Sequence, residues 1–142
     1  MLALSLVAAC GSTEETTNTY SKARPAADEA AIVLTLKTIA AAQQTYFARS
    51  GSSYGTFDQL VESGALDGRF RGAAPVVAGY VFKMNVAPTP GGQQALTYSV
   101  NADPQPTANQ QTTGARHYFM DSNSAIHYNA SQTASAADPL LQ

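Results

Sequence analysis

The sequence predicts an α+β fold in which a long N-terminal helix packs on a three- to four-stranded antiparallel sheet, with one additional short helix. Two patterns support this prediction. Before residue 50, apolar residues recur at three- and four-residue intervals, which is the period of a helix with one buried face. After residue 79 they alternate with polar residues at period two, which is typical of strands. Helices followed by strands that are joined by short turns indicate an α+β domain.

Residues 25–49 are predicted to form the long helix. Pro25 suits the first turn of a helix, and the run Ser50-Gly51-Ser52 predicts its end. The face expected to be buried consists of Ile32, Leu36, Ile39, Gln43 and Tyr46 or Phe47, with Val33 and Leu34 widening it near its start.

A short helix is expected to follow residue 56. Thr56 and Gln59 have the spacing of a capping box, and Gly64 suits the left-handed position after the last turn. Residues 65–78 are predicted to form a loop that Leu66 and Phe70 anchor to the core.

The strands are predicted in two hairpins. Residues 80–86 and 96–102 alternate around a turn at 88–92, and residues 117–120 and 125–128 alternate around a turn at 121–124. The polar segment 129–142 is predicted to be a disordered tail.

The second hairpin carries both histidines, His117 and His127. If Asp121 pairs with Ser124, the two rings point to opposite faces of the sheet, because side chains alternate along a strand. A register shifted by one residue would instead bring the histidines opposite each other.

The single cysteine, Cys10, ends an apolar run of small residues and is followed by Gly11 and Ser12. This arrangement resembles the lipobox of bacterial lipoproteins. The resemblance implies a signal peptide at 1–9 and a lipidated Cys10 at the start of a polar tether at 10–24. The lipid would anchor the protein to a membrane. No Lys or Arg precedes the apolar run, so we expect the true start to lie upstream. The alternative is a chance apolar N-terminus with a buried free cysteine.

Composition limits the remaining possibilities. The chain has 142 residues, a net charge of −2 and 13% charged residues, so 25–128 is expected to form one domain and no basic stripe favours nucleic acid. One cysteine allows no intramolecular disulfide.

Residues 27–128 resemble the soluble half of a type IV pilin or a type II secretion pseudopilin. The resemblance is carried by Ala30–Ile39 with Ala42–Tyr46, by Tyr54–Phe57, by Gly79–Phe82 and by the final hairpin. It implies a pilin-like fold, export, and a structural or interaction role. The chain departs from the family in one respect: a lipobox-like run and a polar tether replace the apolar half-helix that forms the filament core.

A catalytic or metal site is not predicted. Two histidines need a third ligand to hold a transition metal, and no phosphate-binding loop is present. Oxygens for calcium could come from Asn101, Asp103, Asp121 and Asn123, a less favoured reading because calcium takes six to eight oxygen ligands. We therefore expect no cofactor.

The sequence favours a non-catalytic, membrane-anchored, pilin-like lipoprotein that serves as a structural or interaction component of the bacterial envelope. Gly11 after the cysteine resembles lipoproteins of the outer membrane, so the outer membrane or cell surface is the expected location. Protein partners are expected, and a homo-oligomer or filament is compatible with the sequence. The alternatives are a pilin or pseudopilin filament subunit and a solute- or polysaccharide-binding surface module.

Overall fold

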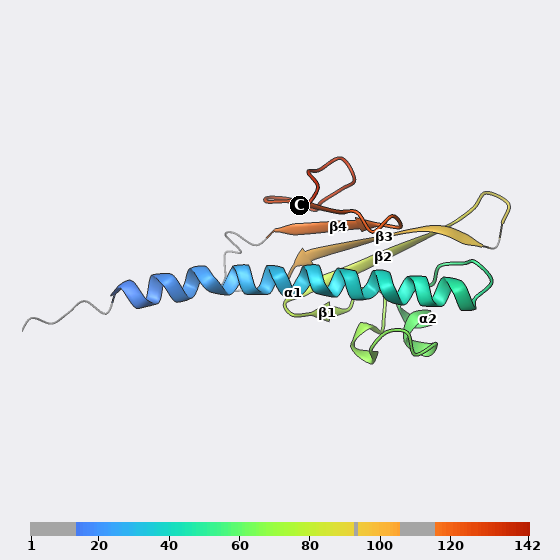
Figure 1. The fold of residues 1–142 in the computed structure, drawn as a ribbon, viewed down its shortest axis with the longest axis horizontal. Helices are drawn as coiled ribbons and strands as arrows, with labels where there is room; N and C mark the ends of the chain where they lie inside the picture. Colours follow the sequence, from blue (N-terminus) through green and yellow to red (C-terminus); the bar gives the residue numbers. More distant parts are fainter. Residues whose placement is uncertain (1–13, 93, 106–115) are drawn as a thin grey trace, which may run out of the picture.

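The computed structural model describes residues 14–92, 94–105 and 116–142, with side chains from Asp28 onward. The fold is α+β, as predicted, and its elements follow one another simply along the chain (Figure 1). They are α1 (Glu14–Arg49), α2 (Phe57–Glu62), the 3₁₀ helix η1 (Gly68–Phe70), β1 (Val76–Val77), β2 (Tyr80–Pro88), β3 (Ala95–Pro104), β4 (His117–Asp121) and β5 (Ile126–Asn129).

All strand pairs are antiparallel, and the five strands lie in chain order, β1-β2-β3-β4-β5. The sheet therefore has five strands, against the predicted three or four. The additional strand, β1, pairs with β2 across Ala78 and Gly79, whose φ angles are 51° and 79°. Two successive residues with positive φ are typical of the tight turns that join antiparallel strands. Two residues are too few to show an alternating pattern in the sequence.

Helix α1 lies across one face of the sheet (Figure 1). The predicted inward residues Ile32, Leu36, Ile39 and Gln43 are fully buried, so the helical periodicity was read correctly. Leu34 is the exception: 66% of its surface is exposed, because it lies on the side of α1 away from the sheet. The expectation that it widens the buried face was wrong.

The start of α1 also differs from the prediction. The helix begins at Glu14, before Pro25, and so includes most of the stretch predicted to be a tether. Glu14, Glu15, Lys22, Ala23 and Arg24 in this stretch are of types with high helix propensity. Polar composition alone does not distinguish a solvated helix from an irregular tether.

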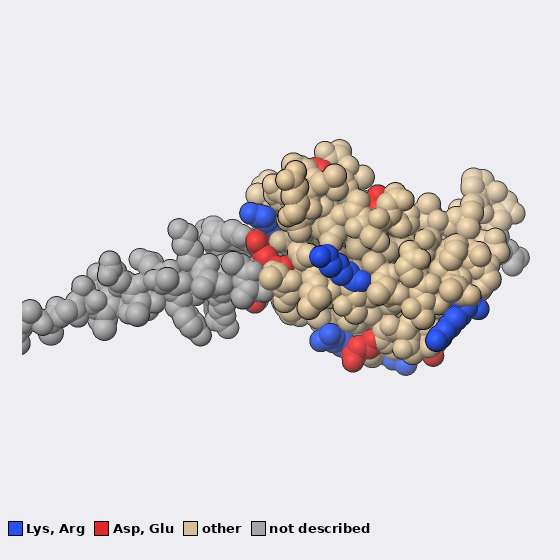
Figure 2. Space-filling view, viewed as in Figure 1, with Lys and Arg blue, Asp and Glu red and all other residues tan. Residues whose placement is uncertain are grey.

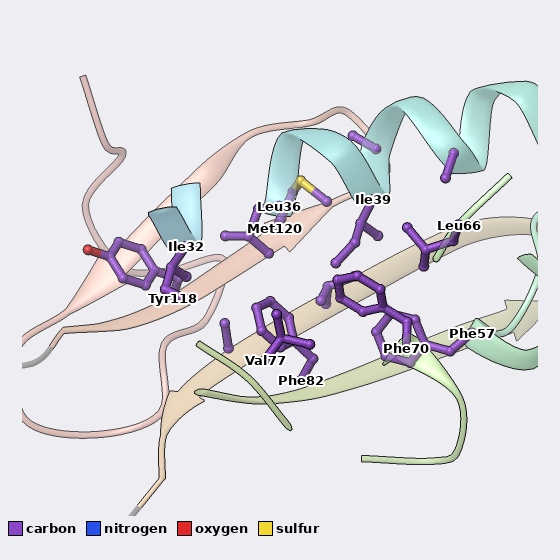
Figure 3. Close-up of a cluster of buried hydrophobic side chains, with 14 of the residues drawn as sticks. Ile32, Leu36, Ile39, Phe57, Leu66, Phe70, Val77, Phe82, Tyr118 and Met120 are labelled. Carbon is purple, nitrogen blue, oxygen red and sulfur yellow. The ribbon is translucent and has the colours of Figure 1, made fainter. Parts of the chain in front are cut away.

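The core fills the space between α1 and the sheet (Figure 3). Near the start of its described side chains, α1 places Ile32 beside Tyr118 and Leu36 beside Met120. Further along, the core continues beneath α2 and η1 through three rings. Phe57 stacks on Phe70 at 6.0 Å between ring centroids, and Phe70 meets Phe82 edge-on at 5.9 Å.

The residues that begin and end α2 were predicted correctly. The amide of Thr56 donates to Gln59 Oε1 at 2.9 Å, and the amide of Gln59 donates to Thr56 Oγ1 at 3.4 Å, which completes the capping box. Gly64 has a φ of 74° after the last turn. Leu66 and Phe70 are buried, as expected of anchors, although η1 and β1 interrupt the predicted loop.

The register of the second hairpin differs from the pairing of Asp121 with Ser124. The amide of Asp121 donates to the carbonyl oxygen of Ala125 at 3.3 Å, and Met120 pairs with Ile126. Ser124 has a φ of 63°, as expected where a three-residue loop closes through one left-handed residue. The loop is thus one residue longer than predicted.

The C-terminal segment is folded, which corrects the prediction of a disordered tail. After β5 the chain turns back, and Leu140 forms a bridge with His127. The amide of Leu141 donates to the carbonyl oxygen of Ile126 at 2.7 Å, and the amide of Tyr128 donates to that of Pro139 at 3.1 Å. Residues 139–141 therefore extend the sheet beyond β5.

Candidate functional site

The predicted anchoring residue lies outside the described part of the chain. Cys10, the signal segment 1–9 and the first tether residues precede Glu14. Within the described residues, no helix combines the length and the apolar character needed to span a bilayer.

The corrected register places both histidines on the same face of the sheet. His117 pairs with Asn129, and His127 pairs with Phe119 two positions along β4. This is the outer face, opposite α1. His117 Nδ1 lies 2.6 Å from Asp103 Oδ1, and both side chains are 22% exposed. His127 Nδ1 donates to the carbonyl oxygen of Asp138 at 2.7 Å. Each histidine thus serves a separate contact, and the two do not converge on a shared ligand.

The four residues considered for calcium also form internal hydrogen bonds. Asn101 Nδ2 donates to the carbonyl oxygen of Ala134 at 2.8 Å, and Asp103 faces His117. Asp121 Oδ1 accepts from the amide of Asn123 at 2.9 Å and thereby holds the hairpin turn. Among the described side chains, no group of three His, Cys, Asp or Glu residues is arranged to bind a metal ion.

Asp138 organises the C-terminal segment, a role that the sequence did not reveal. Its Oδ2 accepts from the amide of Ser135 at 2.7 Å and from Ser135 Oγ at 3.0 Å, and its Oδ1 accepts from Asn129 Nδ2 at 2.8 Å. These hydrogen bonds, the one from the Ser135 amide most of all, lower the pKa of the Asp138 carboxyl. The segment is therefore attached to the outer face by Asp138, Asn101 and His127.

Gln43 joins the C-terminal part of α1 to the segment before α2 through two hydrogen bonds. Its Nε2 donates to the carbonyl oxygen of Gly55 at 2.7 Å, and its Oε1 accepts from the Gly55 amide at 3.0 Å. A Cβ at position 55 would lie 2.8 Å from Tyr46 Cε1, so the close approach requires glycine. The signal in the sequence is a polar residue at a position of the apolar stripe.

Two tyrosines of the core are held in their neutral form. Burial raises the pKa of Tyr98 to about 12, with a smaller contribution from Tyr54. Burial also raises the pKa of Tyr118 to about 12, with a smaller contribution from the Glu29 carboxylate. Their phenols pack against neighbours and keep their protons at neutral pH.

A charged contact ties α1 to the start of β4. The guanidinium of Arg116 lies 3.8 Å from Glu29 Oε1 and 4.8 Å from the centre of the Tyr128 ring. Cation–π stacking and the ion pair together fix the base of the β3–β4 connection against the helix.

Two shallow grooves are present in the described part of the molecule. One, of about 290 Å³, lies between α1 and the C-terminal segment and is lined by Val33, Lys37, Ser124, Ala125, Ile126, Leu140, Leu141 and Gln142. The other, of about 250 Å³, lies beside α2 and is lined by Thr56, Phe57, Asp58, Gly72, Ala73 and Met84. Neither lining contains a histidine.

The outward side of α1 is a regular surface that the core does not use. One row of its exposed residues recurs at alternating three- and four-residue steps, and we call this row the α1 outer stripe: Ala31, Leu34, Thr38, Ala41, Thr45 and Ala48. Every member is uncharged. Figure 2, drawn with α1 toward the viewer, shows few charged side chains on this side of the domain.

No protein-family model, curated protein or solved structure matches this chain.

Proposed function

We propose that this protein is a non-catalytic, pilin-like lipoprotein, anchored to a bacterial membrane through Cys10, that serves as a structural or interaction component of the envelope. The single observation that carries the proposal is the arrangement of α1. One side of this helix closes the core of an antiparallel meander, and its opposite side is exposed and carries Lys37 among mostly uncharged residues.

The order of elements supports the pilin-like part of the proposal. A long helix, a short helix and then a meander of hairpins follow each other in the order that the resemblance implies. In Figure 1, α1 also extends beyond the sheet at its N-terminal end.

The use of polar side chains supports a structural role. His117 joins β4 to β3 through Asp103, and His127 and Asp138 hold the C-terminal segment. Both histidines and Asp138 are thus engaged in contacts that hold the fold together.

Intact-mass spectrometry of the native protein extracted from membranes tests the proposal. The expected mass begins at Cys10 and includes acyl chains. A matched Cys10→Ser variant should move from the membrane fraction to the soluble fraction while keeping the same circular dichroism spectrum. Unmodified Cys10 in the native membrane fraction would refute the lipid anchor.

A filament subunit is the second candidate, and the continuous helix from Glu14 favours it because a pilin uses one long helix as its spine. The segment Glu14–Arg24 is polar, however, whereas the filament core of that family is apolar. The same spectrum separates the two: a longer native chain with a pilin-type start would establish the filament subunit instead.

A further inference from the structure

The two edges of the sheet differ. Beyond β5, residues 139–141 cover one edge with backbone hydrogen bonds. At the other edge, β1 pairs only with the start of β2, and the last hydrogen bond runs from the Phe82 amide to the carbonyl oxygen of Pro75 at 2.9 Å. β2 continues to Pro88, and among the described residues no strand pairs with this side of it after Phe82.

The backbone groups of Met84 and Val86 point out of this open edge. In an antiparallel pair, alternate residues of a strand direct both their N–H and their C=O toward the same neighbour. Phe82 directs its amide toward β1, so Met84 and Val86 direct theirs to that side, whereas Lys83 and Asn85 bond to β3. No described residue bonds to the outward groups of Met84 and Val86. An extended chain laid along the edge would pair them.

The groove beside α2 opens at the same edge. Met84 forms one wall, and its side chain faces the core, where its Sδ lies 3.2 Å from Gln43 Nε2. Ala73 belongs to the lining too, two residues before Pro75, where the chain joins the edge of β2. Side chains of paired strands that lie opposite each other share a face of the sheet. A side chain opposite Met84 on an added strand would therefore enter this groove.

The lining of the groove carries a single charged side chain, Asp58. Its Oδ1 accepts from the Gly72 amide at 2.9 Å, and it forms no ion pair with another described residue. Phe57 and Met84 supply apolar surface beside it. This combination suits a Lys or Arg side chain, whose aliphatic stem packs on apolar surface while its charged end meets a carboxylate.

We propose that the open edge of β2 binds an extended segment of a partner protein as an additional antiparallel strand, with a Lys or Arg of that segment in the groove beside α2. The inference rests on the interaction role proposed above, but not on the lipid anchor. A second copy of this chain fits less well. Paired with itself about a twofold axis, β2 would place an apolar residue opposite Met84, which leaves Asp58 without a cation.

Hydrogen exchange followed by NMR tests the proposal on the full chain with Cys10→Ser. The probe is the capped peptide Thr-Val-Thr-Lys-Thr, which places its lysine opposite Met84 and its valine opposite Val86. Saturating peptide should slow exchange of the Met84 and Val86 amides by at least about tenfold. The amides of Lys83 and Asn85, which already bond to β3, should keep their rates.

Two outcomes of this experiment would overturn the proposal. One is exchange at Met84 and Val86 that stays unchanged up to millimolar peptide. The other is protection that appears without peptide and rises with protein concentration, because it would assign the edge to a second copy. Mass spectrometry of Cys10 and this measurement can each fail without the other, so loss of the lipid anchor and loss of the binding edge are distinguishable.

Variants of the probe and of the chain test the groove. A probe with glutamate in place of lysine should bind about five- to tenfold more weakly. In Asp58→Asn, which keeps an acceptor for the Gly72 amide, the two probes should bind equally. Equal binding of both probes to the parent chain would overturn the assignment of a basic residue to the groove.

A proline at the edge tests the backbone pairing. Val86→Pro removes an outward N–H that β3 does not use, so the fold should tolerate it while peptide binding weakens by at least about tenfold. Val86→Ala is the matched control, because it shortens the same side chain but keeps the N–H; it should bind more tightly than the proline variant. Equal binding by the two variants would overturn the proposal, and circular dichroism shows whether each has kept its fold.

Discussion

Replacement of Gln43 by leucine should destabilise the domain strongly, although the two side chains are similar in size. Leucine fills the same buried space at position 43, but it cannot bond to Gly55, whose amide and carbonyl are themselves buried. Each buried backbone group left without a partner costs about 1–3 kcal/mol. Two such groups predict a loss of about 2–5 kcal/mol in the free energy of unfolding, since the second cost is softened by local relaxation.

Urea denaturation followed by circular dichroism measures this loss directly. Gln43→Ala should be at least as damaging, because it also leaves a cavity. Gln44→Leu is the matched control. Gln44 directly follows Gln43 but is exposed, so the urea midpoint of this variant should stay close to that of the parent chain. If Gln43→Leu were as stable as the parent, the two hydrogen bonds to Gly55 would not be holding α1 to the following segment, and the reasoning would fail.

Three other outcomes are expected. Ile39→Ala should cost about 2–5 kcal/mol in urea denaturation, because Ile39 is fully buried beneath α1; a cost below about 1 kcal/mol would contradict its place in the core. Asp138→Ala should speed hydrogen exchange at the Leu141 amide and leave the sheet intact. Since the pKa of Asp138 is lowered in the fold, its contribution should be complete above the ordinary pKa of 3.8 and disappear as the pH falls through the lowered value. A protection factor of the Leu141 amide that does not change over this pH range would argue against this. Because burial raises the pKa of Tyr98 and Tyr118 to about 12, stability should be unaffected below pH 10 and fall between pH 10 and about 12, as tyrosinate absorbance during alkaline unfolding would show. Titration of all seven tyrosines at the ordinary pH without unfolding would contradict this burial.

The elements with a long repeating pattern could be predicted from the sequence. Four inward positions of α1, the capping box at Thr56 and both hairpins follow from periodicity and from turn residues, because many neighbouring residues report the same structure. Gln43 stood out as a polar residue in an apolar stripe, although its partner, Gly55, could not be identified from spacing.

The features that the sequence did not reveal depend on single contacts. The register of β4 and β5 is set by one left-handed residue, Ser124, and a loop of Asp, Ser and Asn residues is compatible with either loop length. The C-terminal segment shows no apolar periodicity in the sequence. Its place in the fold depends instead on Asp138 and the hydrogen bonds of that side chain, which the sequence does not show. Leu34 looked like a core residue because hydrophobicity alone does not distinguish a buried apolar position from an exposed one.

The return of the chain along β5 has a consequence for how this protein ages and is handled. An open strand edge is a template for adding further strands, and such edges promote aggregation. Here residues 139–141 pair with the edge of β5 and so block the addition of a further strand. A protease that trims them would uncover the backbone groups of Ile126 and Tyr128 on an otherwise intact domain. Trimmed material should accordingly accumulate as insoluble β-rich assemblies, and purification tags are better placed elsewhere than directly after Gln142.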